Sequence, residues 1–202
     1  MSGSILYIHG FNSSPLSMKA RQLEAVMQHL GLARHLRVPA LHHHPRQAIA
    51  QLEADIAELG APLLVGSSLG GYYATHLAER YGLKALLVNP AVRPHLLFDG
   101  YLGTQRNLYT DETWELTLDH VQALAELEVP EPQDAARYQV WLQTGDETLD
   151  YRHAERYYRA CALRIQAGGD HSYQGFMEQM PALLAFADIA RQQYAALDFS
   201  VF

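Results

Sequence analysis

Short apolar runs alternate with longer amphipathic stretches along most of this chain, and the alternation restricts the possible folds more than any other feature. The short runs predict buried strands, and the stretches between them carry apolar residues at helical spacing. Strands joined by helices of this length pair in parallel. The sequence therefore predicts an α/β fold with a doubly wound, mostly parallel sheet and helices on both faces. The expected strands are 5–8, 36–41, 63–65, 85–88, 137–143 and 162–165, and the expected helices are 17–30, 45–59, 68–81, 151–161 and 173–194.

Residues 92–133 interrupt this alternation. They are rich in aromatic and acidic residues and contain no obvious strand. We expect an insertion of helices over the strand ends, a lid or cap; a long surface connection is the alternative. Residues 1–202 have the length of one domain with a substantial core. We therefore expect a single domain that carries 92–133 as its lid.

The composition excludes several functional classes. Apolar residues make up 49% of the chain and charged residues 18%, which is typical of a globular protein rather than a disordered one. The formal net charge is -7 and the only lysines are Lys19 and Lys84, so no basic surface for nucleic acid or an anionic membrane is expected. Cys161 is the only cysteine, and residues 1–4 do not begin a signal peptide. These features favour a cytoplasmic protein without a nucleic-acid or membrane partner.

A Gly-x-Ser-x-Gly motif is centred on Ser68, between a predicted strand and a predicted helix. A nucleophile in this context must occupy a very sharp turn, where bulky side chains at Gly66 and Gly70 would collide. Ser68 would then begin a helix, whose free amides favour developing negative charge. A phosphate-binding loop is disfavoured because Tyr72-Tyr73 replaces the required Lys-Ser/Thr. An inert serine in a glycine-rich turn is the remaining alternative.

Ser68 needs a base, because a serine hydroxyl is a weak nucleophile on its own. In this architecture the chain order is serine, acid, histidine. His171 follows the last predicted strand in a glycine-rich loop, and Asp146 follows the strand before it. Asp146 would hold the imidazole in one tautomer and stabilise its charged form. Asp150 is the rival acid, although its position resembles a helix N-cap.

Two backbone amides are candidates for the oxyanion hole. Phe11 N–H follows the first predicted strand and the turn at Gly10, and Leu69 N–H comes directly after the nucleophile. His9 is expected to fix this loop rather than to catalyse. Arg93 follows the fourth predicted strand, where it would bind an anionic substrate group or pair with a carboxylate.

The run His42-His43-His44 suggests a metal, but adjacent histidines point in different directions and no carboxylate lies at ligand spacing. We therefore expect a solvated loop there, and neither a metal nor another cofactor.

Five motifs occur in order along nearly the whole chain: LYIHGFNSSP at 6–15, GSSLGGYYA at 66–74, LVNPA at 87–91, LQTGDE at 142–147 and GGDH at 168–171. Together they resemble the YqiA-type bacterial esterases. The resemblance implies an α/β-hydrolase fold with Ser68, Asp146 and His171 as its triad. It also implies hydrolysis of carboxylic esters and acyl thioesters, without a defined physiological substrate.

The sequence thus predicts a serine hydrolase that acts on a small-molecule ester or thioester through an acyl-enzyme on Ser68, with His171 as base and Asp146 as the orienting acid. Two alternatives stay open. One is a non-catalytic small-molecule binding protein on the same fold. The other is a peptidase or acyltransferase that uses the same triad. The acyl length, the leaving group and the oligomeric state do not follow from the sequence.

Overall fold

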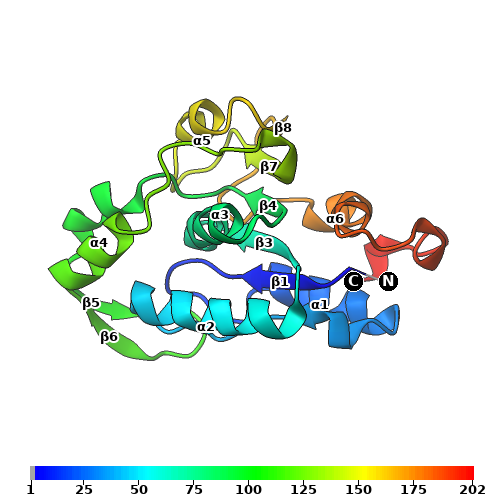
Figure 1. The fold of residues 1–202 in the computed structure, drawn as a ribbon, viewed down its shortest axis with the longest axis horizontal. Helices are drawn as coiled ribbons and strands as arrows, with labels where there is room; N and C mark the ends of the chain where they lie inside the picture. Colours follow the sequence, from blue (N-terminus) through cyan, green and yellow to red (C-terminus); the bar gives the residue numbers. More distant parts are fainter. Residues whose placement is uncertain (1–2) are drawn as a thin grey trace.

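A computed structural model of the protein describes residues 3–202, and its centre is a six-stranded sheet in which every pairing is parallel (Figure 1). The strand order is β2-β1-β3-β4-β7-β8. This order confirms the predicted doubly wound sheet. Met1 and Ser2, which belong to the segment expected not to begin a signal peptide, lie outside the described residues. The strands are β1 Ile5–Ile8, β2 Leu36–Arg37, β3 Leu63–Ser67, β4 Ala85–Val88, β7 Tyr138–Gln143 and β8 Ala162–Gln166.

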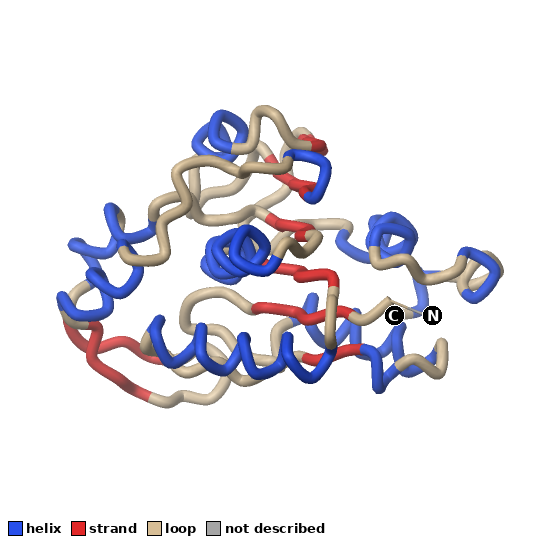
Figure 2. The backbone as a smooth tube through the Cα atoms, in the orientation of Figure 1, coloured by secondary structure: helices blue, strands red, loops and turns tan. Residues whose placement is uncertain are grey.

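Helices cover both faces of the sheet (Figure 2). Successive strand residues point to opposite faces: Leu6 and Ile8 pack with α2, α3 and α5, whereas Ile5 and Tyr7 pack with α1 and α6. Each face therefore has its own buried apolar layer. The helices are α1 Met18–His29, α2 Pro45–Leu59, α3 Leu69–Tyr81, α5 Tyr151–Tyr157 and α6 Met180–Phe186.

Two predicted elements are much shorter than expected. The strand expected at 36–41 pairs only at Leu36–Arg37, and Pro39, which has no N–H to donate, lies just beyond it. The single helix expected at 173–194 was wrong. The 3-10 helix Phe176–Gln179 precedes α6, and α6 itself ends at Phe186. Just beyond that end, Asp188 has a left-handed φ of 58°.

Residues 92–133 contain a β-hairpin as well as helices, so the expectation of an insertion without strands was wrong. β5 Gly103–Arg106 and β6 Thr113–Leu116 pair antiparallel and are followed by α4 Leu118–Ala125. The strands are short, and all their residues except Leu116 are exposed or half-buried, which explains why no apolar run marks them. The hairpin and α4 lie at the end of the molecule toward which β1 points (Figure 1).

The helices of residues 3–202 are all too short or too polar to cross a bilayer.

Candidate active site

Ser68 occupies the sharp turn between β3 and α3. Its φ of 56° and ψ of -122° form a conformation that a residue with a side chain rarely adopts. Backbone hydrogen bonds on both sides hold it there: Ser68 N–H donates to Val88 O at 3.1 Å, and Ala91 N–H donates to Ser68 O at 3.0 Å. The strained turn is thus fixed by β4 and the loop that follows β4.

The glycines of the motif are required by close backbone contacts. A Cβ at Gly66 would lie 2.4 Å from Gly70 O, which is the predicted collision across the turn. A Cβ at Gly70 would instead lie 2.0 Å from Ile8 O. Gly70 is therefore required by the neighbouring β1 and not by the turn itself.

A chain of hydrogen bonds joins Ser68, His171 and Asp146. His171 Nε2 lies 2.9 Å from Ser68 Oγ, and His171 Nδ1 lies 2.8 Å from Asp146 Oδ2. Because Nδ1 must donate to the carboxylate, Nε2 of the neutral ring is free to accept the serine proton. This is the arrangement that a serine nucleophile and its base require.

Asp146 is held by its own loop. Its side chain is 2% exposed, and Oδ1 accepts hydrogen bonds from Thr148 N–H at 2.9 Å and Leu149 N–H at 2.8 Å. Asp150, the rival acid, caps α5 by accepting from Arg152 N–H at 3.0 Å. The structure thus brings Asp146 to His171 and leaves Asp150 at the helix.

Asn89, which the sequence analysis missed, anchors the His171 loop to the sheet. It is 2% exposed and directly follows β4. Its Nδ2 donates to Asp170 O at 3.0 Å and to His171 O at 3.2 Å, and its Oδ1 accepts from Gln143 N–H at 3.0 Å. Its φ of 42° is left-handed, a conformation that asparagine tolerates better than most residues. A polar residue directly after an apolar strand was the available signal.

Gln143, at the end of β7, is a second anchor of the same loop. It is 3% exposed, and its Oε1 accepts from Asp170 N–H at 3.1 Å and Gln174 N–H at 2.8 Å. A Cβ at Gly169 would lie 2.0 Å from this Oε1, so the glycine before Asp170 makes room for the amide. Lys19 adds a third anchor, donating from Nζ to Ser172 O at 2.7 Å, and burial lowers its pKa to about 8.

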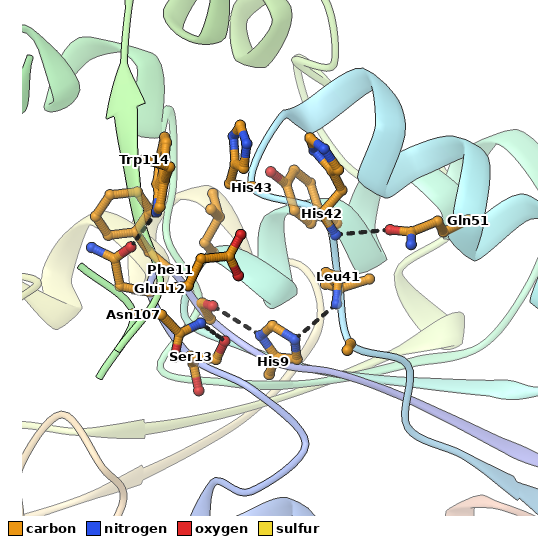
Figure 3. Close-up of a pocket in the computed structure, with 15 residues that line it drawn as sticks. His9, Phe11, Ser13, Leu41, His42, His43, Gln51, Asn107, Glu112 and Trp114 are labelled. Carbon is orange, nitrogen blue, oxygen red and sulfur yellow. Dashed lines mark hydrogen bonds between the residues drawn. The ribbon is translucent and has the colours of Figure 1, made fainter. Parts of the chain in front are cut away.

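A hollow of about 270 Å³ is lined by the loops that follow β1 and β2, among other segments (Figure 3). Gly10 lines it, and a Cβ built there would lie 3.6 Å from Ser68 Oγ. Phe11 and Leu69 line the same hollow. Leu69 is the first residue of α3, where a backbone N–H has no partner within the helix. The structure therefore brings both candidate oxyanion donors to one cavity beside Ser68.

His9 joins the loops that follow β1 and β2. It is 4% exposed, and its Nε2 accepts from Leu41 N–H at 3.2 Å (Figure 3). Its Nδ1 must then carry the proton and donates to Gly10 O at 3.1 Å. Burial lowers the pKa of His9. A neutral ring thus fixes the glycine turn before Phe11.

Two of the three consecutive histidines, His43 and His44, contact the insertion rather than solvent alone. The His43 ring stacks on Trp114 with centroids 4.7 Å apart, and His44 Nε2 lies 2.8 Å from Asp119 Oδ2. His43 Nδ1 lies 3.2 Å from Nε2 of His120, whose pKa burial and neighbouring histidines lower to about 4. Among residues 3–202, no three His, Cys, Asp or Glu side chains are arranged to hold a metal ion.

Arg93 lies apart from this cavity. Its Nε donates to Glu128 Oε1 at 2.8 Å, and its side chain is half exposed. It lines a different hollow, with Arg156 and Arg159. The structure thus shows the ion pair that was one of its two expected roles and does not bring Arg93 to the hollow beside Ser68.

Comparison with known families finds one match across nearly the whole chain. The model of an uncharacterised protein family, UPF0227, matches residues 4–188. A UPF0227 protein of Shewanella woodyi is 27% identical over 194 residues, which cover 90% of this chain and 98% of that relative. A UPF0227 protein of Shewanella sp. (strain ANA-3) is 32% identical over 104 residues, 48% of this chain and 55% of that relative.

Solved structures similar to this one share its fold at low sequence identity. A putative hydrolase from Agrobacterium vitis S4 has a TM-score of 0.71 at 17% identity, with 91% of this chain and 87% of that chain covered. The mouse alpha/beta hydrolase domain-containing protein 10 has a TM-score of 0.68 at 14% identity, with 93% and 90% covered. Est1E from Butyrivibrio proteoclasticus, with bound ferulic acid, has a TM-score of 0.67 at 15% identity, with 96% and 90% covered. At these identities the likeness shows the α/β-hydrolase fold.

Proposed function

The chain belongs to the UPF0227 family, the family of the YqiA-type esterases, and we propose that it is a serine hydrolase of carboxylic esters or acyl thioesters. One observation carries this proposal: the hydrogen-bonded chain from Asp146 through His171 to a serine held in a strained turn beside a cavity. A serine in this state is ready to lose its proton as it attacks a carbonyl.

In the first half of the reaction, Ser68 Oγ attacks the carbonyl carbon while His171 Nε2 takes the serine proton. The bond from the carbonyl carbon to the leaving oxygen or sulfur then breaks. His171 gives its proton to that leaving group, and the acyl group stays on Ser68. Asp146 stabilises the imidazolium that exists between these two proton transfers.

In the second half, water replaces the leaving group. His171 takes a proton from the water as its oxygen attacks the acyl carbon. The bond to Ser68 Oγ breaks, and the serine regains a proton from His171 as the free acid departs. In both halves the backbone N–H groups of Phe11 and Leu69 are the proposed donors to the oxyanion, and one such donor typically contributes about 3–4 kcal/mol in the transition state.

We further propose that residues 92–133 act as a cap over the site. Three of their side chains, Asn107, Glu112 and Trp114, line the hollow beside Ser68. The same segment also reaches the loop after β1, because Leu108 N–H donates to Asn12 O at 2.9 Å. This placement supports the proposal that the insertion takes part in substrate selection.

The test is a panel of p-nitrophenyl esters and acyl thioesters of increasing chain length, measured with wild type and Ser68→Ala. We expect Ser68→Ala to lower kcat by at least about 1000-fold, because its partners cannot act without the nucleophile. A fluorophosphonate probe should label the wild type, with the adduct mapped to Ser68 by mass spectrometry. Circular dichroism checks that the variant is folded.

Ser172→Ala is the matched control, because its Oγ donates to Asp170 at 2.6 Å and not to the His171 ring. It should retain turnover and labelling. Full turnover by Ser68→Ala would overturn the proposal. Tight binding of an ester without a burst of product would instead identify a non-catalytic binding protein.

A further inference from the structure

The hollow and the proposed base lie on opposite sides of Ser68. Ser68 follows β3; β1 and β2 are on one side of that strand, and β4, β7 and β8 are on the other. The hollow is lined by the loops after β1 and β2, by the insertion and by the start of α3. His171 follows β8. The two features therefore approach the nucleophile from different directions.

This placement decides which part of a substrate the hollow receives. The leaving group takes its proton from His171 Nε2, so it must depart on the His171 side. The carbonyl oxygen points to the proposed donors Phe11 and Leu69. The remaining substituent of the carbonyl carbon, the acyl chain, is then directed toward the hollow.

Glu112 supplies the only negative charge among the residues described around the hollow. Its carboxylate points into the cavity from the β5–β6 turn (Figure 3). The described lining residues include no lysine, arginine or aspartate. The carboxylate makes no hydrogen bond or ion pair with another described residue, and its charge acts on the His43 ring. Burial and the adjacent His42 lower the pKa of His43, so near neutral pH that ring does not balance the charge of Glu112.

Two other polar side chains around the hollow, Asn107 and Gln51, already have partners. Asn107 Oδ1 accepts from Tyr109 N–H and Thr110 N–H, and its Nδ2 donates to Ser13 O at 2.9 Å. Gln51 Oε1 accepts from His42 N–H at 2.8 Å. The Glu112 carboxylate is thus an acceptor left for a substrate.

The walls of the hollow suit a short carbon chain. Phe11 and Trp114 pack edge to face with centroids 5.7 Å apart, and Leu41 and Tyr73 add further apolar surface. A volume of about 270 Å³ lies just below the range typical of small-molecule pockets, about 300–1,000 Å³. A six-carbon acyl group with one terminal polar group fits, whereas a long fatty acyl chain extends beyond the cavity.

We propose that this hollow is the acyl pocket, and that Glu112 makes the enzyme select compact acyl groups with a protonated amine at their far end. The inference rests on the proposed hydrolase function and adds a substrate class to it. Glu112 is exposed at a hollow whose lining is partly apolar and partly polar, and its carboxylate binds an ammonium group more strongly than a methyl group.

The experiment compares p-nitrophenyl hexanoate with p-nitrophenyl 6-aminohexanoate near pH 7, each corrected for the reaction without enzyme. We expect wild type to favour the amino ester by about tenfold in kcat/KM, mainly through a lower KM. Glu112→Gln should reduce this preference to about onefold. Glu115→Gln is the matched control: it removes a carboxylate from the same hairpin outside the hollow, and it should keep the preference.

A second ester pair tests the direction of binding. Hexyl acetate and 6-aminohexyl acetate carry the same groups on the leaving-group side, and release of acid reports their hydrolysis. We expect no preference for the amine in this pair. A preference confined to this pair would overturn the acyl assignment.

The remaining outcomes separate the inference from the function on which it rests. If wild type hydrolyses the hexanoate at least as well as the amino ester, or if Glu112→Gln keeps the preference, the role of Glu112 is overturned and the hydrolase stands. If wild type hydrolyses none of the esters and thioesters, the proposed function fails, and the inference fails with it.

Discussion

The two sides of Ser68 are built in different ways. On the side of β4, β7 and β8, the loop that carries His171 is held by the amides of Asn89 and Gln143, which are 2% and 3% exposed. On the side of β1 and β2, the insertion is attached by partly exposed groups such as Asn107 and Trp114. The position of the proposed base therefore depends on the sheet, whereas the shape of the hollow depends on surface contacts. Chemistry and specificity can then change independently.

Two asparagines make this comparison testable, because each makes three hydrogen bonds through its side chain. Asn89→Leu leaves buried partners unsatisfied, and we expect it to lower the free energy of unfolding by about 4 kcal/mol. It should also lower kcat by about 100-fold or more, because His171 is no longer held at Ser68. Urea unfolding and ester turnover measure the two effects.

Asn107→Leu is the matched variant on the other side of the nucleophile. Its partners regain water, so we expect a loss of about 1 kcal/mol and a change in KM rather than in kcat. Equal losses for Asn89→Leu and Asn107→Leu would show that the two sides are held equally firmly.

The sheet and the candidate triad were predictable because they depend on local patterns. Apolar runs mark the strands, and the carboxyl ends of parallel strands lie at one edge, so Ser68, Asp146 and His171 could be brought together from chain order alone. The α/β-hydrolase fold and the family were confirmed by the comparisons.

The features that escaped prediction depend on contacts between distant segments. The β5–β6 hairpin has apolar alternation only at Trp114 and Leu116 of β6, and only Leu116 of its eight residues is buried. In the sequence, Asn89 and Gln143 resemble ordinary polar residues at strand ends. Their role becomes visible only in the folded structure, where they bind the loop that carries His171. Side chains that act through tertiary contacts leave only weak signals in a single sequence.

Gln143→Met sharpens the comparison within the loop that carries His171. It leaves Asp170 N–H and Gln174 N–H without their acceptor, so we expect a loss of about 2–3 kcal/mol in the free energy of unfolding. Turnover should fall by roughly tenfold. The matched variant is Gln51→Met on the other side, which removes one acceptor, for His42 N–H, and should lower stability by less than about 1 kcal/mol. A larger loss for Gln51→Met would reverse the comparison.

His120 makes the attachment of the insertion sensitive to acid. Its pKa is about 4 in the folded protein, mainly because of burial, against an ordinary value of 6.5. As the pH falls through this interval, the unfolded chain takes up a proton that the folded chain does not, so stability is fully present above 6.5 and is lost toward 4. We expect wild type to lose roughly 1–2 kcal/mol relative to His120→Gln across this interval.

Urea unfolding of both proteins from pH 7 to pH 4 measures this difference. Subtracting one stability curve from the other removes the contribution of the titratable groups that both proteins contain. Glutamine keeps a side-chain N–H donor for His43 Nδ1, so the comparison isolates the proton at position 120. Parallel stability curves would contradict the depressed pKa.

Arg93 gives the smallest expected effect, because its ion pair with Glu128 is half exposed and such pairs contribute about 0–1 kcal/mol. Arg93→Ala should leave stability and turnover of methyl 4-acetoxybenzoate nearly unchanged. If Arg93 binds an anionic leaving group, as we propose from its place after β4, the variant raises KM for 4-acetoxybenzoate by about threefold to tenfold. Arg106→Ala, which removes an exposed arginine paired with Asp111 on the insertion, should not raise it. If the KM for 4-acetoxybenzoate is the same in wild type and in Arg93→Ala, and the KM for the methyl ester is also unchanged, the ion pair with Glu128 is the whole role of Arg93. The enzyme would then select leaving groups by shape alone.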